Sequence, residues 1–181
     1  MKLLLLAAAL ALPLTLPAQD THSDAAMADM HHDKPPVPPS HSLNVTFQGH
    51  TTTFTVEDLL KLPQVTLHVH NAHSNQDETY TGPLVSDVLA KAGLSPAHEN
   101  EALILHSSIV ATATDNYFVL YSAAEVEPAF TTGRVIIALM KAGLPNAPGG
   151  NIQLVNESGA KPARWVHGLS SLNIMTLAPT R

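Results

Sequence analysis

The sequence predicts a single mixed α+β domain. Short stretches with strand-like alternation are interspersed with short stretches of helical spacing, but the two kinds do not alternate strictly, as they would around a parallel sheet. Hydrophobic residues make up 45% of the 181 residues, which is enough for a packed core. The chain contains no cysteine, so neither a disulfide nor a thiolate ligand is available to it.

The first residues have the pattern of a secretory signal peptide, which we place at residues 1–18. Lys2 supplies a positive start, residues 3–16 are almost wholly apolar, and Ala18 is a small residue at a plausible cleavage point. The apolar run is shorter than the about 20 residues of a membrane span, although an uncleaved anchor is the alternative. We therefore expect a periplasmic or secreted protein without stable membrane insertion after cleavage.

Residues 19–42 are expected to form a disordered tail rich in His, Met and Pro. Apolar residues are sparse there, and four prolines make a stiff spacer. The histidines and methionines suit copper or zinc, while a plain solvated linker is the alternative. Loss of Lys2 with the leader changes the net charge from −6 to −7, so nucleic acid and anionic membrane surfaces are poor partners.

Residues 43–177 are expected to form the globular domain. Its first half is predicted to contain a hairpin of residues 43–47 and 51–55, a short helix capped by Thr55 and Asp58, a strand over 65–70, a polar loop over 71–81, and a helix over 84–92 that ends at Gly93.

The second half is predicted to contain more strands than helices. We expect strands over 102–105, 109–113 and 117–121, a turn at Asp115 and Asn116, a helix over 123–127 with a capping box of Ser122 and Glu125, a buried strand over 134–140, a Gly/Pro-rich connection over 141–150, and final strands over 152–155 and 172–177.

Three groups of residues, in this order, resemble the oxidoreductase molybdopterin-binding domain best known from sulfite oxidases. Residues 80–93 look like the family's helix entry, residues 113–117 like its A-x-D-G-Y turn, and residues 150–155 followed by 163–166 like its G-x-x-R-L-V strand and the segment after it. The resemblance spans nearly the whole mature domain. It implies a sulfite-oxidase-type fold, molybdopterin as the family's cofactor, and four cofactor-binding positions: Asp115, Tyr117, Arg164 and Trp165.

The departures from this family argue against working molybdenum chemistry. In the family, a Cys in the loop after an early strand ligates molybdenum, and the corresponding residues 65–73 contain none. The pterin phosphate needs cationic or backbone donors, and basic residues are few. A loaded enzyme is normally exported with a twin-Arg leader, whereas this leader has only Lys2. We expect an oxidoreductase-like domain without molybdenum catalysis, and the sequence leaves open whether it is an enzyme.

Three histidines, His68, His70 and His73, stand where the missing Cys would be. The first two share one face of the predicted strand, and the third follows in the loop. Neutral imidazoles suit Zn²⁺ or Cu²⁺, so the three are candidate metal ligands. The apolar residues that alternate with them predict a buried opposite face, so a solvent-facing strand without any ligand explains the same pattern.

The remaining candidates also have structural alternatives. Arg164 is a candidate anchor for a small anion and Trp165 a candidate wall of its cleft, although packing is the usual role of a lone Trp. Asp115 and Tyr117 would equally serve a turn and a core edge. Three functions stay open: a redox enzyme, a binding protein for a metal ion or small ligand in the old cofactor cleft, and a module that docks on an unknown protein partner. The absence of Cys disfavours the first, and the histidines favour the second.

Overall fold

The computed structural model describes residues 37–158 and 161–177. The described residues belong to one compact unit of the chain, Pro36–Arg181. The predicted leader, and the predicted tail as far as residue 36, lie outside the described residues. Among the residues described, no helix is long and apolar enough to cross a membrane.

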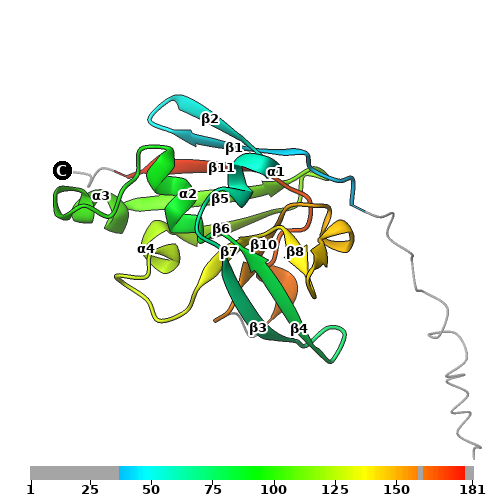
Figure 1. Cartoon of the computed structure of the whole chain (residues 1–181). Coiled ribbons are helices and arrows are strands. Elements are labelled where there is room, and N and C mark those ends of the chain that lie inside the picture. Colours follow the sequence, from blue (N-terminus) through cyan, green and yellow to red (C-terminus); the bar gives the residue numbers. More distant parts are fainter. Residues whose placement is uncertain (1–36, 159–160, 178–181) are drawn as a thin grey trace, which may run out of the picture. The chain divides into compact units, whose positions relative to one another are not determined.

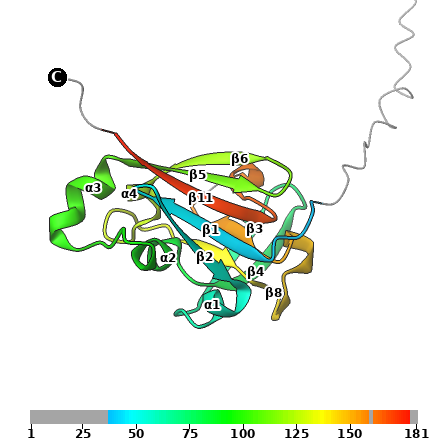
Figure 2. The ribbon, with the colours of Figure 1, turned by 90° about the horizontal axis from the view of Figure 1, so that it is seen from above.

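A five-stranded sheet with the order β2-β1-β11-β5-β6 forms one layer (Figures 1 and 2). Neighbouring strands are antiparallel, except that β1 and β11 are parallel. The strands are β1 (Ser42–Phe47), β2 (His50–Thr55), β5 (Ser107–Ala113), β6 (Phe118–Ser122) and β11 (Leu169–Thr176). The predicted N-terminal hairpin is therefore present, and its second strand leads directly into the first helix.

Two smaller sheets lie beneath this layer. One has the order β3-β4-β8-β9 and the other pairs β10 with β7. Their strands are β3 (Val65–Asn71), β4 (Gln76–Gly82), β7 (Val135–Ala138), β8 (Met140–Lys141), β9 (Leu144–Pro145) and β10 (Gln153–Asn156). All four residues of β7 and of β10 are buried, which explains why the sequence around β7 looks like a central strand.

The helices are short. They are α1 (Val56–Leu60), α2 (Val85–Lys91), α3 (Glu101–Leu105), α4 (Ala123–Val126) and the 3₁₀ turns η2 (His98–Asn100), η3 (Ala147–Gly149) and η4 (Pro162–Arg164). The capping box of Thr55 and Asp58 is present at α1. The α2 helix ends at Lys91, with Ala92 as its C-cap, and Gly93 follows with a φ of 103° that suits glycine; the Leu94 N–H bonds back to the Leu89 carbonyl at 2.9 Å.

Two hydrophobic clusters hold these layers together. The larger one joins the inner face of the five-stranded sheet to α2, whose Val88 and Leu89 are buried. The smaller one lies under the β3–β4 hairpin, where the rings of Tyr80 and Trp165 meet edge to face with centroids 5.6 Å apart. The mixture of strands and short helices confirms the predicted α+β class.

Three local predictions are wrong. Residues 76–81, expected as part of a loop over 71–81, belong to β4, because cross-strand hydroxyl pairs such as Thr66 with Thr81 suit a strand whose outer face is polar. Residues 102–105, expected as strand, belong to α3, since so short an apolar run has no decisive period. The capping box of Ser122 and Glu125 is absent: Ser122 makes no side-chain cap at α4, and the Glu125 carboxylate bonds to Arg164.

Candidate functional site

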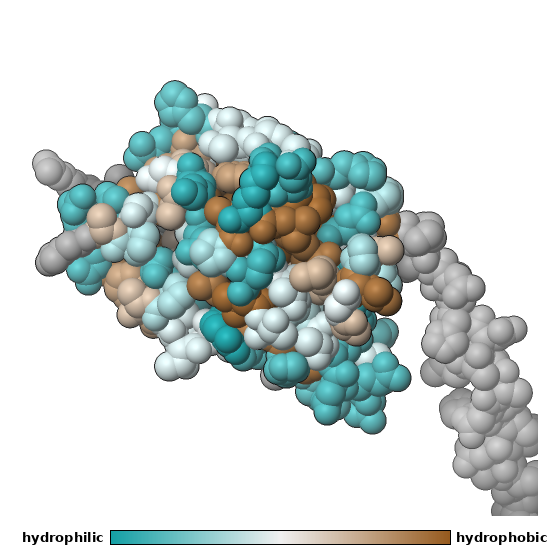
Figure 3. Space-filling model, viewed as in Figure 1, coloured by the Kyte–Doolittle hydropathy of each residue, from teal (hydrophilic) through white to brown (hydrophobic). Residues whose placement is uncertain are grey.

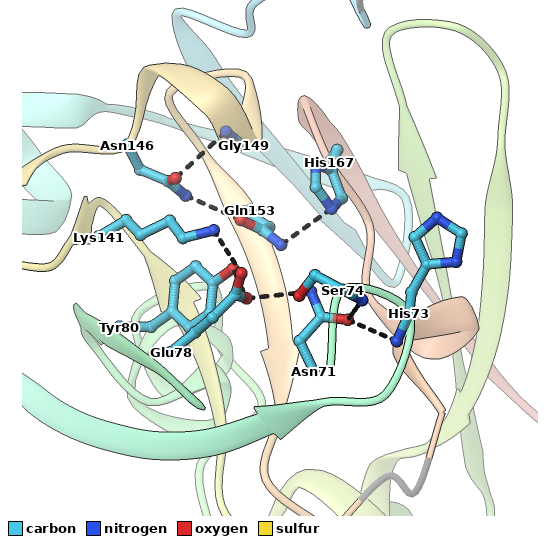
Figure 4. A network of polar contacts seen from close by, with 10 residues as sticks. All are labelled: Asn71, His73, Ser74, Glu78, Tyr80, Lys141, Asn146, Gly149, Gln153 and His167. Carbon is cyan, nitrogen blue, oxygen red and sulfur yellow. Dashed lines mark hydrogen bonds and ion pairs between the residues drawn. The ribbon is translucent and has the colours of Figure 1, made fainter. Parts of the chain in front are cut away.

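A network of polar side chains lies where the β3–β4 hairpin meets β8, η3 and β10 (Figure 4). Alternate residues of the hairpin point inward. Those nearer the core, such as Leu67 and Val69, are apolar and buried. Towards the hairpin tip, the inward positions are taken by Asn71 and Glu78, so the apolar cluster gives way to a polar one.

Glu78 is the centre of the first half of the network. Its carboxylate accepts hydrogen bonds from the Tyr80 hydroxyl at 2.7 Å, from the Lys141 ammonium at 2.7 Å and from the Asn71 amide at 3.1 Å. Only 8% of its side chain is exposed. Desolvation raises the pKa of Glu78, but the three donors outweigh it and leave that pKa below its ordinary value. The carboxylate is therefore ionised and fully engaged.

The second half of the network is a relay of two buried amides that ends on His167. The Asn146 oxygen accepts the Gly149 N–H at 3.2 Å, so its amide nitrogen donates to the Gln153 oxygen at 3.0 Å. The Gln153 nitrogen then faces His167 Nε2 at 3.2 Å. Because an amide nitrogen only donates, this arrangement requires His167 Nε2 to be an acceptor and the ring to be neutral.

The surroundings of His167 favour the same neutral form. Although part of the residue is exposed, desolvation of the ring lowers the pKa of His167, and the Lys141 ammonium lowers it further. A hydrogen bond to the backbone of Pro148 and the carboxylates of Glu78 and Asp115 act in the opposite direction without prevailing. Pro148 has no N–H, so the backbone group that favours the protonated ring is its carbonyl.

The structure places Arg164 at the edge of the five-stranded sheet. Its guanidinium forms an ion pair with Glu125, with one N–O distance of 3.1 Å, and lies 4.3 Å from the centre of the Tyr121 ring. It also donates to the Leu120 carbonyl at 3.2 Å. Arg164 thus covers the unpaired side of β6, and its charge is already balanced by a carboxylate.

The other three residues from the resemblance have structural contacts of their own. Trp165 is 3% exposed and donates to the Asn156 carbonyl at 3.2 Å. Asp115 accepts the Tyr117 N–H at 3.0 Å within the turn between β5 and β6. The Tyr117 hydroxyl donates to the Ala163 carbonyl. None of the three has a hydrogen bond to the described network of Figure 4.

The three histidines are not brought together. His68 and His70 lie on the exposed face of β3, where Nδ1 of His68 is 3.1 Å from the Thr79 hydroxyl and Nδ1 of His70 is 2.8 Å from the Asp77 carboxylate. The backbone N–H of His73 bonds to Asn71 at 3.0 Å. The hairpin tip is hydrophilic (Figure 3). Within the described ranges, no group of three or more His, Cys, Asp or Glu residues could hold a metal ion, so the metal site stays a prediction.

Sequence reasoning missed the centre of the site. His167, Gln153 and Asn146 were not among the candidate residues. A usable signal exists for Gln153, which interrupts the apolar segment of β10 and is fully buried. A polar residue in that position needs a buried partner, but the sequence does not show which one.

The fold, and not the sequence, relates this chain to known proteins. No family model matches the chain, and no curated protein matches it significantly. Among solved structures, the chain is similar to the sulfane dehydrogenase SoxCD from Paracoccus pantotrophus, with a TM-score of 0.57 and 19% identity over 74% of this chain. The match covers 38% of the other chain, so this chain spans well under half of that protein. The similarity supports a distant sulfite-oxidase-like fold.

Molybdopterin, which that fold implies, does not match the residues present at this site. The end of β3 and the loop after it offer Asn71 and His73 where the family has its thiolate, and the sequence contains no Cys. Two candidate cations, Lys141 and Arg164, are held by Glu78 and Glu125. A phosphate would have to displace a carboxylate from either one.

Proposed function

We propose that this protein is an exported domain of sulfite-oxidase-like fold that does not catalyse molybdenum redox chemistry and instead binds a small polar ligand beside His167. The observation that carries the proposal is the closed network around Glu78. The Glu78 carboxylate accepts hydrogen bonds from Asn71, Tyr80 and Lys141, so it is already used within the protein. Such a network stabilises a binding surface, but it leaves no free ligand for a metal centre.

Three residues around the proposed ligand position, His167, Lys141 and Asp115, indicate the kind of ligand; we call them the rim. His167 is exposed, Lys141 retains further N–H donors, and the Asp115 carboxylate lies close enough to act on His167. Cationic and anionic groups are both present, so neither a strong anion nor a strong cation is favoured. A neutral or zwitterionic molecule with both donors and acceptors suits this rim best.

Native mass spectrometry tests the proposal directly. Protein isolated under mild conditions from its exported compartment should carry a small molecule that is released on denaturation. His167→Leu removes a polar contact at the rim and should lose that mass. Thr53→Leu, on the exposed face of the distant β2 strand, should keep it. A wild-type protein that is bare in repeated preparations contradicts the proposal.

One observation favours metal binding as a second candidate. His68 and His70 both use Nδ1 to bond a β4 residue, which turns Nε2 of each ring towards solvent. Histidines that ligate metals are commonly oriented in this way by a second hydrogen bond. A pair of such rings is a starting point for Zn²⁺ or Cu²⁺ binding, with water or a third residue completing the site.

Calorimetry decides this second candidate. A chain that begins at Pro36 retains the whole compact unit and lacks the His/Met tail. It should take up Zn²⁺ or Cu²⁺ at about pH 7.5, because only neutral imidazoles bind a metal ion. His68→Ala/His70→Ala should abolish uptake, and His50→Ala should not. No uptake by the unmutated chain rules the site out.

A further inference from the structure

The outer face of the five-stranded sheet is divided into a polar half and an apolar half. On β1 and β2, threonine and asparagine side chains bond one another across the strands, as Thr53 and Asn44 do at 2.8 Å. On β6 and the end of β11, large apolar side chains are exposed instead: Phe118 by 59%, Leu120 by 56% and Met175 by 43%. Seen from above, no described helix or strand crosses this face (Figure 2).

A groove adjoins the apolar half. It has a volume of about 550 Å³ and is lined by residues from the end of α3, from β5 and β6, and from the end of β11. Leu105, Leu120 and Leu177 supply its apolar surface, and Ser122 lies at its β6 end. Phe118 stands at the opposite end of β6 and does not line the groove. The β6 strand therefore presents the exposed Phe118 ring at its start and the groove at its end.

The charge distribution favours a second copy of the chain as the occupant. The strands β5, β6 and β11 contain no Asp, Glu, Lys or Arg. The chain as a whole has a net charge of −6, so most contacts between two copies would be repulsive. An uncharged face is where two copies can approach without that repulsion, and exposed apolar patches on soluble proteins commonly mark interaction sites.

We propose that the protein forms a two-fold symmetric dimer through the apolar half of this sheet. The axis runs between the two sheets, perpendicular to β6 and level with Leu120. This symmetry sets β6 of one copy antiparallel to β6 of the other, so Phe118 of each copy enters the groove of its partner. A two-fold contact of this kind uses the same patch twice and closes, which avoids open-ended assembly. The two faces would pack as sheets do in a β-sandwich.

Sedimentation equilibrium of the full mature chain tests the dimer. We expect reversible dimerisation between micromolar and millimolar concentrations. Leu120→Glu and Phe118→Glu should weaken it by at least about tenfold, because each places carboxylates from both copies in the apolar contact. Thr53→Glu, on the polar half of the same sheet, should leave it unchanged. Circular dichroism should show that each variant is folded, because all three side chains are exposed.

Cross-linking tests the position of the axis independently. Because the sequence has no Cys, Leu120→Cys gives each chain a single thiol. Close to a two-fold axis, two such thiols should form an intermolecular disulfide under mild oxidation, whereas Thr53→Cys should form no intermolecular disulfide. A wild-type chain that is monomeric at every concentration overturns the proposal. So does a dimer that tolerates Leu120→Glu and fails to cross-link through position 120.

Discussion

At the scale of single residues, Glu78 and His167 determine the character of the site. The Glu78 carboxylate is almost buried and depends on three donors, of which Lys141 alone carries charge. His167 is held neutral because a buried amide donates to it. Glu78 therefore stabilises the fold while it is ionised, and His167 while it is neutral. The pH dependence of the unfolding free energy measures both.

Removal of the Lys141 charge should destabilise the domain. Lys141→Met leaves the Glu78 carboxylate desolvated without its cation, which we expect to lower the free energy of unfolding by about 1–3 kcal/mol. Adding Glu78→Gln to that variant should recover part of the loss, since no unpaired charge remains. Urea denaturation measures both. Lys61→Met is the control: that ammonium pairs with exposed carboxylates and should have no detectable effect. Equal effects at the two lysines would contradict the role given to Glu78.

The pH dependence of stability should report on His167. The pKa of its folded form is lowered from 6.5, so the unfolded chain takes up a proton first as the pH falls. Its contribution to stability is therefore complete above that value and is lost progressively below it. The difference in unfolding free energy between wild type and His167→Gln, which does not titrate, should shrink from neutral pH towards pH 5. A difference that is constant over this interval would show that the ring is not held neutral.

At the scale of elements, short strands and helices are tied together by a few buried side chains. The α2 helix has seven residues, too few to be stable alone, so its packing against the sheet must hold it in place. The β6 edge is protected by η4, through the Arg164 bond to the Leu120 carbonyl. Arg164, the candidate anion-binding residue, is therefore used here to bond the unpaired edge of β6.

The packing of α2 is tested by shortening one leucine. Leu89 is 3% exposed and faces the main core, so Leu89→Ala should lower the free energy of unfolding by about 2–5 kcal/mol. The matched control is Leu60→Ala in α1, where the side chain is 45% exposed and leaves no comparable cavity. Thermal or urea unfolding compares the two. Similar losses at both positions would mean that α2 does not pack as described.

Local signals predicted the elements well where sequence neighbours determine them. The cap at Thr55, the stop at Gly93 and the turn at Asn116, whose φ is 67°, follow from nearby residues. The centre of the site did not follow, because Glu78, Lys141 and His167 come from distant segments. Their meeting depends on the pairing of β4 with β8 and of β10 with β7, which no periodicity reveals. The metal ligands were chosen for residue type, and the same types suit an exposed strand face.

At the scale of the whole molecule, a sulfite-oxidase-like architecture surrounds a site without a thiolate. The fold similarity reaches a TM-score of 0.57, while identity is 19%, so the architecture is shared and the chemistry is not established by it. The closed Glu78 network and the paired cations explain how the domain can be stable without molybdopterin. We therefore propose that this domain binds a small ligand, and that its stability does not depend on a cofactor.

The metal content of the native protein tests this claim most directly. Elemental analysis of the chain, purified from its native source without chelators or denaturants, gives the amount of molybdenum per chain. We expect no stoichiometric molybdenum, together with a cooperative unfolding transition that added molybdate does not change. One molybdenum atom per chain would contradict the account, because it would mean that the cofactor binds without a cysteine thiolate and displaces the carboxylates from Lys141 or Arg164.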